Sequence, residues 1–153
     1  MINLSEEDKD DIAFLLNNVG PHLKNPSIIY KLIWSEYIQK ASGFMLDAIL
    51  PDKDCSGIYK ITNLNNKKAY IGRSTSVRRR ITEHIKSVVG VGTIADQHVH
   101  SVMRQEGLWN FKFELVEVCE KDKLGEREKY YIDFFKTQTW GYNIVSGSAY
   151  KGE

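Results

Sequence analysis

The sequence predicts an α+β protein with a small three-stranded antiparallel or mixed sheet flanked by helices and preceded by a helical N-terminal extension. Apolar residues recur at helical spacing up to about residue 50, and a polar, turn-prone segment follows at 51–54. Beyond it, β-branched and aromatic residues form short runs typical of strands. A chain of 153 residues can bury one core with a small appendage. We therefore predict an extension over residues 1–54 and a domain over residues 55–153.

The extension carries the signals of three helices. Ser5 precedes acidic residues, as an N-cap does, and apolar residues at helical spacing then continue to about residue 20. A second helix is expected from Pro26 to about residue 42, because proline is favoured at the first helical position. A third, short helix is predicted over 44–50. These helices are expected to provide target specificity, a dimer surface or simply packing against the second domain.

The second domain changes to a mixture of strands and helices. Asn65 and Asn66 favour a turn between two strand-like runs, which predicts a hairpin. Gly90 and Gly92 indicate a loop, and Gly107 ends a helix. In chain order we expect strands at 57–62 and 68–71, helices at 77–88 and 97–106, a strand at 111–116, a helix at 123–135, and a turn or short strand at 141–144.

The charge is divided unevenly along the chain. Residues 1–56 hold five Lys and Arg against nine Asp and Glu, a net charge of −4, whereas residues 57–153 hold sixteen against eleven, a net charge of +5. A local excess of positive charge favours a polyanion as partner, although a charge run alone is more often a solvated surface. Nine basic residues lie between positions 57 and 104: Lys60, Lys67, Lys68, Arg73, Arg78, Arg79, Arg80, Lys86 and Arg104.

Cysteine and histidine usage gives no metal site. Cys55 and Cys119 lie far apart without ligand spacing, so neither a disulfide framework nor a zinc site is predicted. His98 and His100 stand two residues apart on a predicted helix and should point to different faces, as ordinary surface or groove residues. No apolar run is long enough to span a bilayer. We expect a cytoplasmic protein, encoded by a prokaryote or phage, with no membrane partner.

Two tripeptides at a fixed spacing carry the strongest functional signal. Gly57-Ile58-Tyr59 is followed, after ten residues, by Tyr70-Ile71-Gly72. With the residues downstream, the chain resembles the GIY-YIG nuclease superfamily from Gly57 to about Gly147. Four further residues stand in the order in which that family shows them: Arg80, His84, Glu128 and Asn143. The resemblance does not reach the N-terminal extension.

The residues themselves suit phosphodiester hydrolysis, which needs an activated water and neutralisation of phosphate charge. Arg80 and His84, at i and i+4, project from one helix face, and arginine presents a planar fork to phosphate oxygens. The resemblance implies that Tyr59 is the base for the attacking water, with His84 orienting or deprotonating that water. It also implies that Tyr70 and Arg80 contact the scissile phosphate. The choice between Tyr59 and His84 as base stays open.

The resemblance further implies that Glu128 binds a single Mg²⁺, for which Mn²⁺ can substitute, because one carboxylate with several waters suits this ion. Asn143 is expected to hold Glu128 or a phosphate oxygen in place. Taken singly, each residue has a duller interpretation, such as a strand tyrosine or a surface glutamate, and only the ordered set outweighs it. The residues predicted to contact DNA directly are Lys60, Arg73, Ser74, Arg78, Arg79, Lys86 and Arg104.

The sequence thus predicts a metal-dependent DNA endonuclease. Few residues follow Gly147, so target choice is expected from the N-terminal helices, from the loop at 90–96 or from a partner, and we predict restriction-type double-strand cleavage by a possible homodimer. One alternative is a nucleic-acid-binding adaptor. Another is a partner-activated or low-specificity nuclease of the repair, mobility or toxin type. The catalytic pattern is complete at all six positions, which argues against the adaptor.

Overall fold

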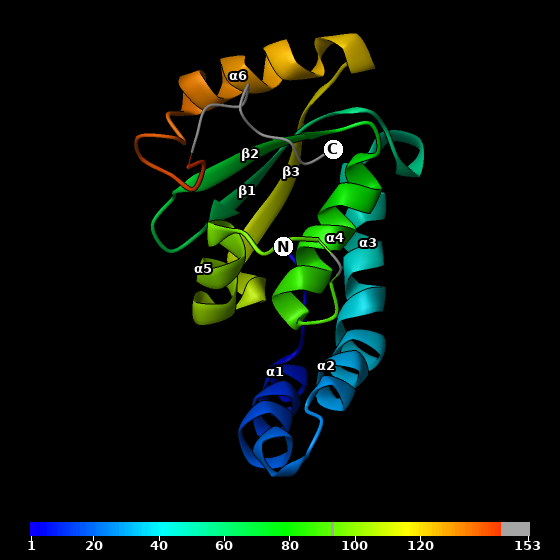
Figure 1. Ribbon diagram of the computed structural model, residues 1–153. Helices are drawn as coiled ribbons and strands as arrows, with labels where there is room; N and C mark the ends of the chain where they lie inside the picture. Colours follow the sequence, from blue (N-terminus) through cyan, green and yellow to red (C-terminus); the bar gives the residue numbers. More distant parts are fainter. Residues whose placement is uncertain (93, 145–153) are drawn as a thin grey trace.

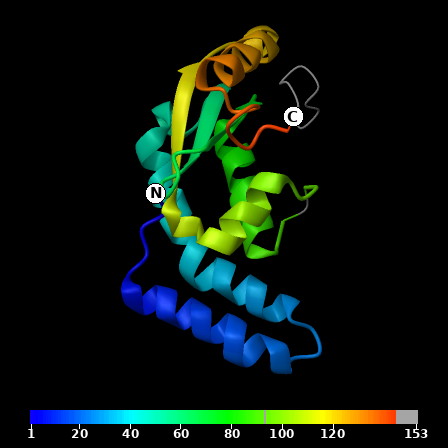
Figure 2. The ribbon, with the colours of Figure 1, turned by 90° about the vertical axis from the view of Figure 1, so that its left-hand side faces the viewer.

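The computed structural model describes residues 1–92 and 94–144. Helices α1 and α2 lie at the end of the molecule that is farthest from the sheet, whereas α3 runs beside α4, which spans Val77–Val89 (Figures 1 and 2). The Ser5 side chain caps α1 by accepting from the backbone N–H of Asp8 at 3.0 Å, as predicted. The N-terminal segments are α1 (Glu6–Phe14), a π-helical turn (Leu15–Val19), a 3-10 turn (Gly20–His22), α2 (Ser27–Ile33), a second π-helical turn (Trp34–Ile38) and α3 (Gln39–Ile49).

The predicted break between a second and a third helix is wrong. The chain stays helical from Ser27 to Ile49, and Gly43 lies inside α3. A glycine in a helix costs about 1 kcal/mol relative to alanine. That cost is offset here because α3 buries Met45 and Leu46 in the core, and tertiary packing commonly overrides propensity.

The three strands form one antiparallel sheet in the order β2-β1-β3, so the predicted fold class is confirmed. Helices α4 and α5 lie on one side of this sheet and α6 lies on the other (Figures 1 and 2). The elements of this half are a 3-10 turn (Pro51–Lys53), β1 (Gly57–Asn63), β2 (Ala69–Ser74), α4, α5 (His98–Glu106), a 3-10 turn (Leu108–Asn110), β3 (Phe111–Val118), a 3-10 turn (Lys121–Lys123) and α6 (Leu124–Phe135).

In the second domain, the largest difference from the predicted elements is the length of β2. It continues to Ser74, three residues beyond the predicted end, because Gly72, Arg73 and Ser74 stay paired with the start of β1. Of the turn or short strand predicted at 141–144, the structure shows a bend at Gly141 and Tyr142 and no strand. There, the backbone N–H of Tyr142 donates to the carbonyl of Ala69 at 2.9 Å, which fixes the bend against the edge of β2.

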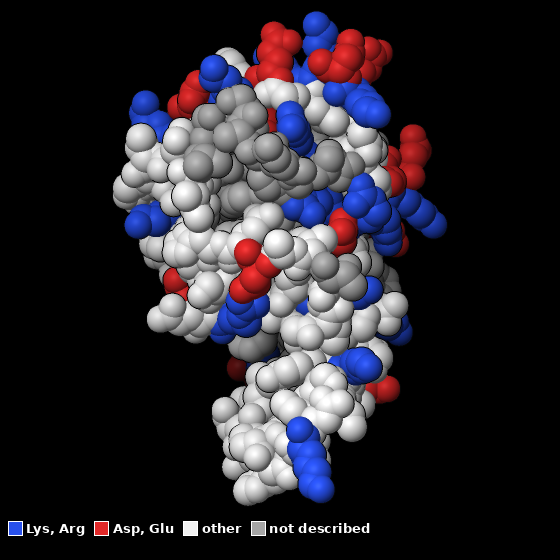
Figure 3. Space-filling model, in the orientation of Figure 1, with Lys and Arg blue, Asp and Glu red and all other residues white. Residues whose placement is uncertain are grey.

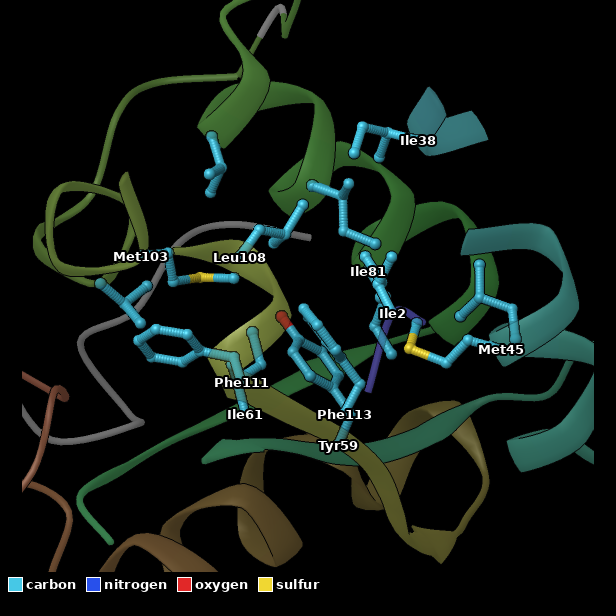
Figure 4. Packing of buried hydrophobic residues seen from close by; sticks show 14 of the residues in the cluster. Ile2, Ile38, Met45, Tyr59, Ile61, Ile81, Met103, Leu108, Phe111 and Phe113 are labelled. Carbon is cyan, nitrogen blue, oxygen red and sulfur yellow. The ribbon is translucent and has the colours of Figure 1, made fainter. Parts of the chain in front are cut away.

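Two apolar clusters lie on opposite faces of the sheet. The larger cluster includes Tyr59, Ile61 and Ile81, and it extends without interruption to Ile2 and Met45 of the N-terminal segment (Figure 4). The N-terminal helices therefore pack on the second domain, one of the three roles considered for them, while specificity and dimerisation stay predictions. The smaller cluster lies under α6 and consists of Ile58, Ile71, Leu124 and Ile132.

Charged side chains are interspersed on the face seen in Figure 3. Lys and Arg alternate with Asp and Glu over its upper part, whereas the lower part, formed by the N-terminal helices, carries few charges. Within residues 1–92 and 94–144, no helix has the length and apolar character needed to cross a membrane. The C-terminal boundary of the predicted domain at residue 153 lies outside the described residues.

Candidate active site

The antiparallel pairing of β1 and β2 places two tyrosines on one face of the sheet. Tyr59 lies opposite Gly72, and Tyr70 lies opposite Ile61, so the two tyrosine side chains share the face that α4 covers. Their ring centroids are 6.4 Å apart. A Cβ atom at Gly72 would overlap the Tyr59 ring, which explains why the second tripeptide needs glycine at this position.

Arg80 and His84 reach the tyrosines from α4. Ser76 caps this helix, since its hydroxyl accepts from the backbone N–H of Arg79 at 3.2 Å. Both Arg80 and His84 are buried, as the i, i+4 spacing predicted for a shared face. The Oη of Tyr59 lies 2.7 Å from Nε2 of His84, within hydrogen-bonding distance. The two residues that the sequence left as alternative bases, Tyr59 and His84, are therefore hydrogen-bonded to each other.

Burial dominates the protonation of this group. It raises the pKa of the Tyr59 phenol, while the charge of Arg80 and a hydrogen bond to it act in the opposite direction. Burial also holds the pKa of Tyr70 well above its usual value and that of His84 well below, the charge of His100 adding to the latter effect. In the absence of substrate, therefore, both phenols and the imidazole are neutral.

His100 belongs to this group, and its prediction as a surface or groove residue is wrong. It is fully buried, and its Nε2 lies 2.7 Å from Nδ1 of His84. The sequence carried one signal for this placement, because His100 stands beside Val99 and one turn before Met103 on the apolar side of α5. His98, by contrast, is exposed, in keeping with the expectation that the two histidines point apart.

Glu128 projects from α6 toward the opposite face of the sheet. It is one turn from both Leu124 and Ile132 and is 1% exposed. Among the described residues, neither of its carboxylate oxygens has a hydrogen-bond partner. The nearest cation, Nε of Arg73, stands 3.7 Å away, within ion-pair range but too far for a hydrogen bond. Burial raises the pKa of Glu128 to about 7, although the charge of Arg73 lowers it.

This buried carboxylate has the chemistry of a metal ligand. Its charge raises the pKa of both Tyr59 and Tyr70, so it lies within electrostatic range of the tyrosines despite its place on the other face. No group of three or more His, Cys, Asp and Glu side chains gathers anywhere in residues 1–92 or 94–144. A cation here would take a single protein carboxylate and complete its shell with water and substrate oxygens, the arrangement that Mg²⁺ accepts.

The side chain of Asn143 has a different partner from the one predicted. Its Oδ1 accepts from the backbone N–H of Ile71 at 2.9 Å, and its Nδ2 donates to the carbonyl of Ile71, also at 2.9 Å. The amide thus replaces a neighbouring strand at the free edge of β2. Asn143 contacts the backbone of the second tripeptide, whereas the sequence suggested Glu128 or a phosphate oxygen.

The basic residues predicted to contact DNA are spread over several surfaces. Several already pair within the protein: Arg78 Nη1 with Asp47 at 2.7 Å, Arg79 Nη1 with Glu83 at 2.7 Å, and Arg104 with Asp96. The cation of Lys86 lies over the ring of Trp34, and that of Lys60 over the ring of Phe135 on the α6 side. Arg73 is the residue beside Glu128.

Ser74 does not suit its predicted contact with DNA. It is fully buried, and its hydroxyl donates to the carbonyl of Ser76 at 2.6 Å. The same oxygen accepts from the backbone N–H of Ser76 at 2.9 Å. The hydroxyl therefore forms the turn between β2 and α4, which sets the direction from which Arg80 approaches the tyrosines.

Comparisons with known proteins agree with this geometry. The family model of the GIY-YIG catalytic domain matches residues 55–143. Intron-associated endonuclease 1 of Enterobacteria phage T4 is 29% identical to this chain over 100 residues, which make up 61% of this chain and 38% of the relative. The chain thus spans little more than a third of that relative's length.

Two solved structures resemble the same part of the chain. A mutant form of the catalytic domain of intron endonuclease I-TevI is 29% identical, with a TM-score of 0.53, and the match covers 63% of this chain and 98% of that one. The catalytic domain of homing endonuclease I-TevI is 28% identical, with a TM-score of 0.52, and the match covers 60% and 99% of the two chains. In both cases, about two fifths of this chain has no counterpart.

Proposed function

Because this chain belongs to the GIY-YIG catalytic domain family, we propose that it is an endonuclease that hydrolyses phosphodiester bonds in DNA. One observation carries the proposal. A buried tyrosine–histidine pair, with Tyr59 Oη 2.7 Å from His84 Nε2, lies next to the guanidinium of Arg80. Such a cluster supplies a base for water and a positive charge for phosphate in one place.

In the proposed reaction, Arg80 and Tyr70 bind the non-bridging oxygens of the scissile phosphate. A water proton passes to Oη of Tyr59, the water oxygen bonds to phosphorus, and the bond to the leaving oxygen breaks. The leaving oxygen then takes a proton from solvent. Tyr59 must first release its own proton to solvent and enter this step as phenolate. The charge of Arg80 favours that form by lowering the pKa that burial raises.

We propose Glu128 as the protein ligand of one Mg²⁺, for which Mn²⁺ can substitute. The support is the buried carboxylate itself, whose two oxygens have no hydrogen-bond partner among the described residues. When bound, the ion would supply positive charge that stabilises the charge developing on the phosphate in the transition state. Asn143 would keep β2 in place under Tyr70 through its two bonds to the Ile71 backbone.

The proposal also concerns which DNA target is cut and whether both strands are cut. We retain sequence-selective, restriction-type cleavage of both strands by a homodimer as a prediction, since one active site cuts one strand at a time. A second candidate is an intron-type endonuclease activity, which the names of the similar proteins favour. In either case, target choice is expected from the N-terminal helices, from the loop at 90–96 or from a partner.

Plasmid cleavage tests the proposal most directly. The purified protein is incubated with supercoiled plasmid and Mg²⁺, Mn²⁺ or EDTA, alongside Glu128→Ala. A matched control is Glu126→Ala, which removes a 70% exposed carboxylate two residues away on α6. We expect cleavage by the wild type and the control with either metal ion, and none by Glu128→Ala or with EDTA.

The pattern of products separates the candidates. Discrete fragments would support target selection, whereas a smear would indicate a low-specificity nuclease. DNA binding without cleavage under either metal ion would contradict the endonuclease proposal and favour the adaptor. Cleavage by Glu128→Ala at the wild-type rate would leave the nuclease standing but would remove Glu128 as the metal ligand.

A further inference from the structure

The start of α5 contains a fixed hydrogen-bond donor that points at a histidine. The backbone N–H of Gln97, the N-cap residue, donates to Nδ1 of His100 at 3.1 Å. This bond is half of a capping box, in which the side chain at the third helical position normally reaches back to the N-cap backbone. A backbone N–H can only donate. Nδ1 of His100 is therefore the acceptor in this bond and carries no proton.

The direction of this bond determines the two that follow. A neutral imidazole carries one N–H, so the proton of His100 is on Nε2 and is donated to Nδ1 of His84 at 2.7 Å. His84 must then carry its own proton on Nε2, which donates to Oη of Tyr59 at 2.7 Å. All three bonds point the same way, from the backbone of α5 to the phenol on β1.

We propose that His100 is a positioning residue, which transmits the direction of the capping box to His84 and thereby holds Tyr59 Oη as a hydrogen-bond acceptor. This assigns the base that the sequence left open. With its Nε2 protonated and its Nδ1 occupied, His84 has no free lone pair for a water proton, and Tyr59 is the group that takes it. The catalytic meaning rests on the proposed function, whereas the hydrogen-bond direction does not.

The surroundings favour neutral rings in this arrangement. Burial lowers the pKa of both His84 and His100, and the positive charge of Arg80 on α4 acts in the same direction on each. The other charged groups near His100 are Arg104, which lowers its pKa, and Asp96, which raises it. The rings of Tyr59 and Tyr70, on β1 and β2, also contact the His84 ring.

Asp96 provides the competing arrangement. Its Oδ1 lies 3.3 Å from Nδ1 of His100. A proton on Nδ1 would reverse the bond between His100 and His84 and the bond between His84 and Tyr59. His84 would then accept a hydrogen bond from the Tyr59 hydroxyl and act as the base for that hydroxyl. Two features oppose this reversal. The Asp96 carboxylate already binds Arg104, and the Gln97 N–H would lose its acceptor.

The tautomers can be read directly by NMR. In the ¹⁵N-histidine-labelled protein, long-range ¹H–¹⁵N correlations assign the protonated nitrogen of each ring. The exposed His22 and His98 serve as references in the same sample. We expect His84 and His100 both to be protonated at Nε2, in the wild type and in Asp96→Asn. Protonation of His100 at Nδ1, or a change of His84 tautomer in Asp96→Asn, would overturn the proposal.

Two substitutions connect the tautomer to catalysis. His100→Gln keeps an amide that can accept from the Gln97 N–H and donate to His84, whereas His100→Leu keeps neither. We expect His100→Leu to mix the His84 tautomers and to reduce kcat about tenfold to hundredfold with little change in KM, and His100→Gln to restore most of both. Equal loss in the two variants would contradict a role through hydrogen bonding. Absence of cleavage in the wild type would count against the proposed function alone, since the NMR result stands by itself.

Discussion

The two faces of the sheet bury ionisable groups in opposite ways. On the α4 face, Tyr59, His84 and His100 form an unbroken chain of hydrogen bonds and stay neutral. On the α6 face, Glu128 lies between Leu124 and Ile132 without a hydrogen-bond partner among the described residues. The described residues satisfy the hydrogen bonds of this chain, although the Tyr70 hydroxyl beside it has no hydrogen-bond partner among them. They supply no hydrogen-bond partner for either carboxylate oxygen of Glu128.

The physical cost of the two arrangements differs accordingly. A buried polar group costs little when it is hydrogen-bonded, but a buried charge without partners costs several kcal/mol. The chain of Tyr59, His84 and His100 should therefore be stable with or without ligand. The buried Glu128 carboxylate should destabilise the fold when no cation is bound, and a bound cation should remove this cost. The carboxylate proposed to serve activity therefore lowers stability.

Glu128→Gln provides the largest test of this comparison. The amide keeps the shape of the side chain and removes the negative charge, so we expect cleavage to fall by at least about a thousandfold while the free energy of unfolding rises by about 1–3 kcal/mol. Plasmid cleavage and urea unfolding measure the two effects, with Glu126→Gln as control. A loss of both activity and stability would mean that the carboxylate is already well paired, and the contrast between the faces would disappear.

The pH dependence of stability gives the second test. The pKa of Glu128 rises from 4.5 to about 7 on folding, so the folded protein binds the proton more tightly than the unfolded chain does. Stability from this group is therefore present below about pH 4.5 and is lost as the pH rises toward 7, by about 3 kcal/mol in total.

This effect can be isolated by difference. The buried neutral histidines change stability in the opposite direction, because the unfolded chain takes up their protons as the pH falls. We therefore compare the wild type with Glu128→Gln by urea unfolding between about pH 5 and about pH 8. The excess stability of the variant should grow with pH, and saturating Mg²⁺ at the higher pH should reduce it by stabilising only the wild type. A constant difference would refute the raised pKa.

Contacts that follow from local periodicity could be predicted from the sequence, whereas contacts that depend on how helices dock could not. The spacing of the two tripeptides and of Arg80 and His84 follows from strand pairing and from the helical repeat, so their proximity was predictable. His100 was not, because its contact with His84 depends on how α5 docks against α4 and on the capping box at Gln97. Periodicity alone does not contain that information.

Asn143 and the N-terminal helices show the same limit. The motif predicted that Asn143 is part of the site, but its bonds to Ile71 arise from the position of the bend beside the edge of β2. The helical segments 27–33 and 39–49 were recognisable, yet their continuity through Gly43 depends on packing that only the folded chain provides. No local pattern in residues 1–54 indicates a ligand.

Asn143→Asp tests a buried side chain whose hydrogen bonds are satisfied, and its effect should be smaller than that of Glu128→Gln. The substitution keeps the oxygen that accepts from the Ile71 N–H and removes the donor to the Ile71 carbonyl, which leaves two acceptors facing each other. We expect a loss of about 1–3 kcal/mol in the free energy of unfolding, measured in urea, together with reduced cleavage.

The matched control is Asn25→Asp. At that position, Oδ1 accepts from the backbone N–H of Ser27 at 3.2 Å and from its hydroxyl at 2.6 Å, so aspartate should accept both bonds equally well. Equal stability changes at the two sites would show that the Nδ2 donor of Asn143 contributes nothing. Asn143 would then need another role in the site.

Arg79→Ala should have the smallest effect on stability and is informative for that reason. Arg79 is 51% exposed and its ion pair with Glu83 is an i, i+4 surface pair, so its removal should change the free energy of unfolding by less than about 0.5 kcal/mol. If Arg79 contacts a DNA phosphate, the same variant should bind DNA more weakly at every sequence and reduce the slope of log Kd against log salt by about 0.9. Unchanged salt dependence would assign Arg79 to the solvated surface and move the DNA path toward Arg73, the basic residue beside Glu128.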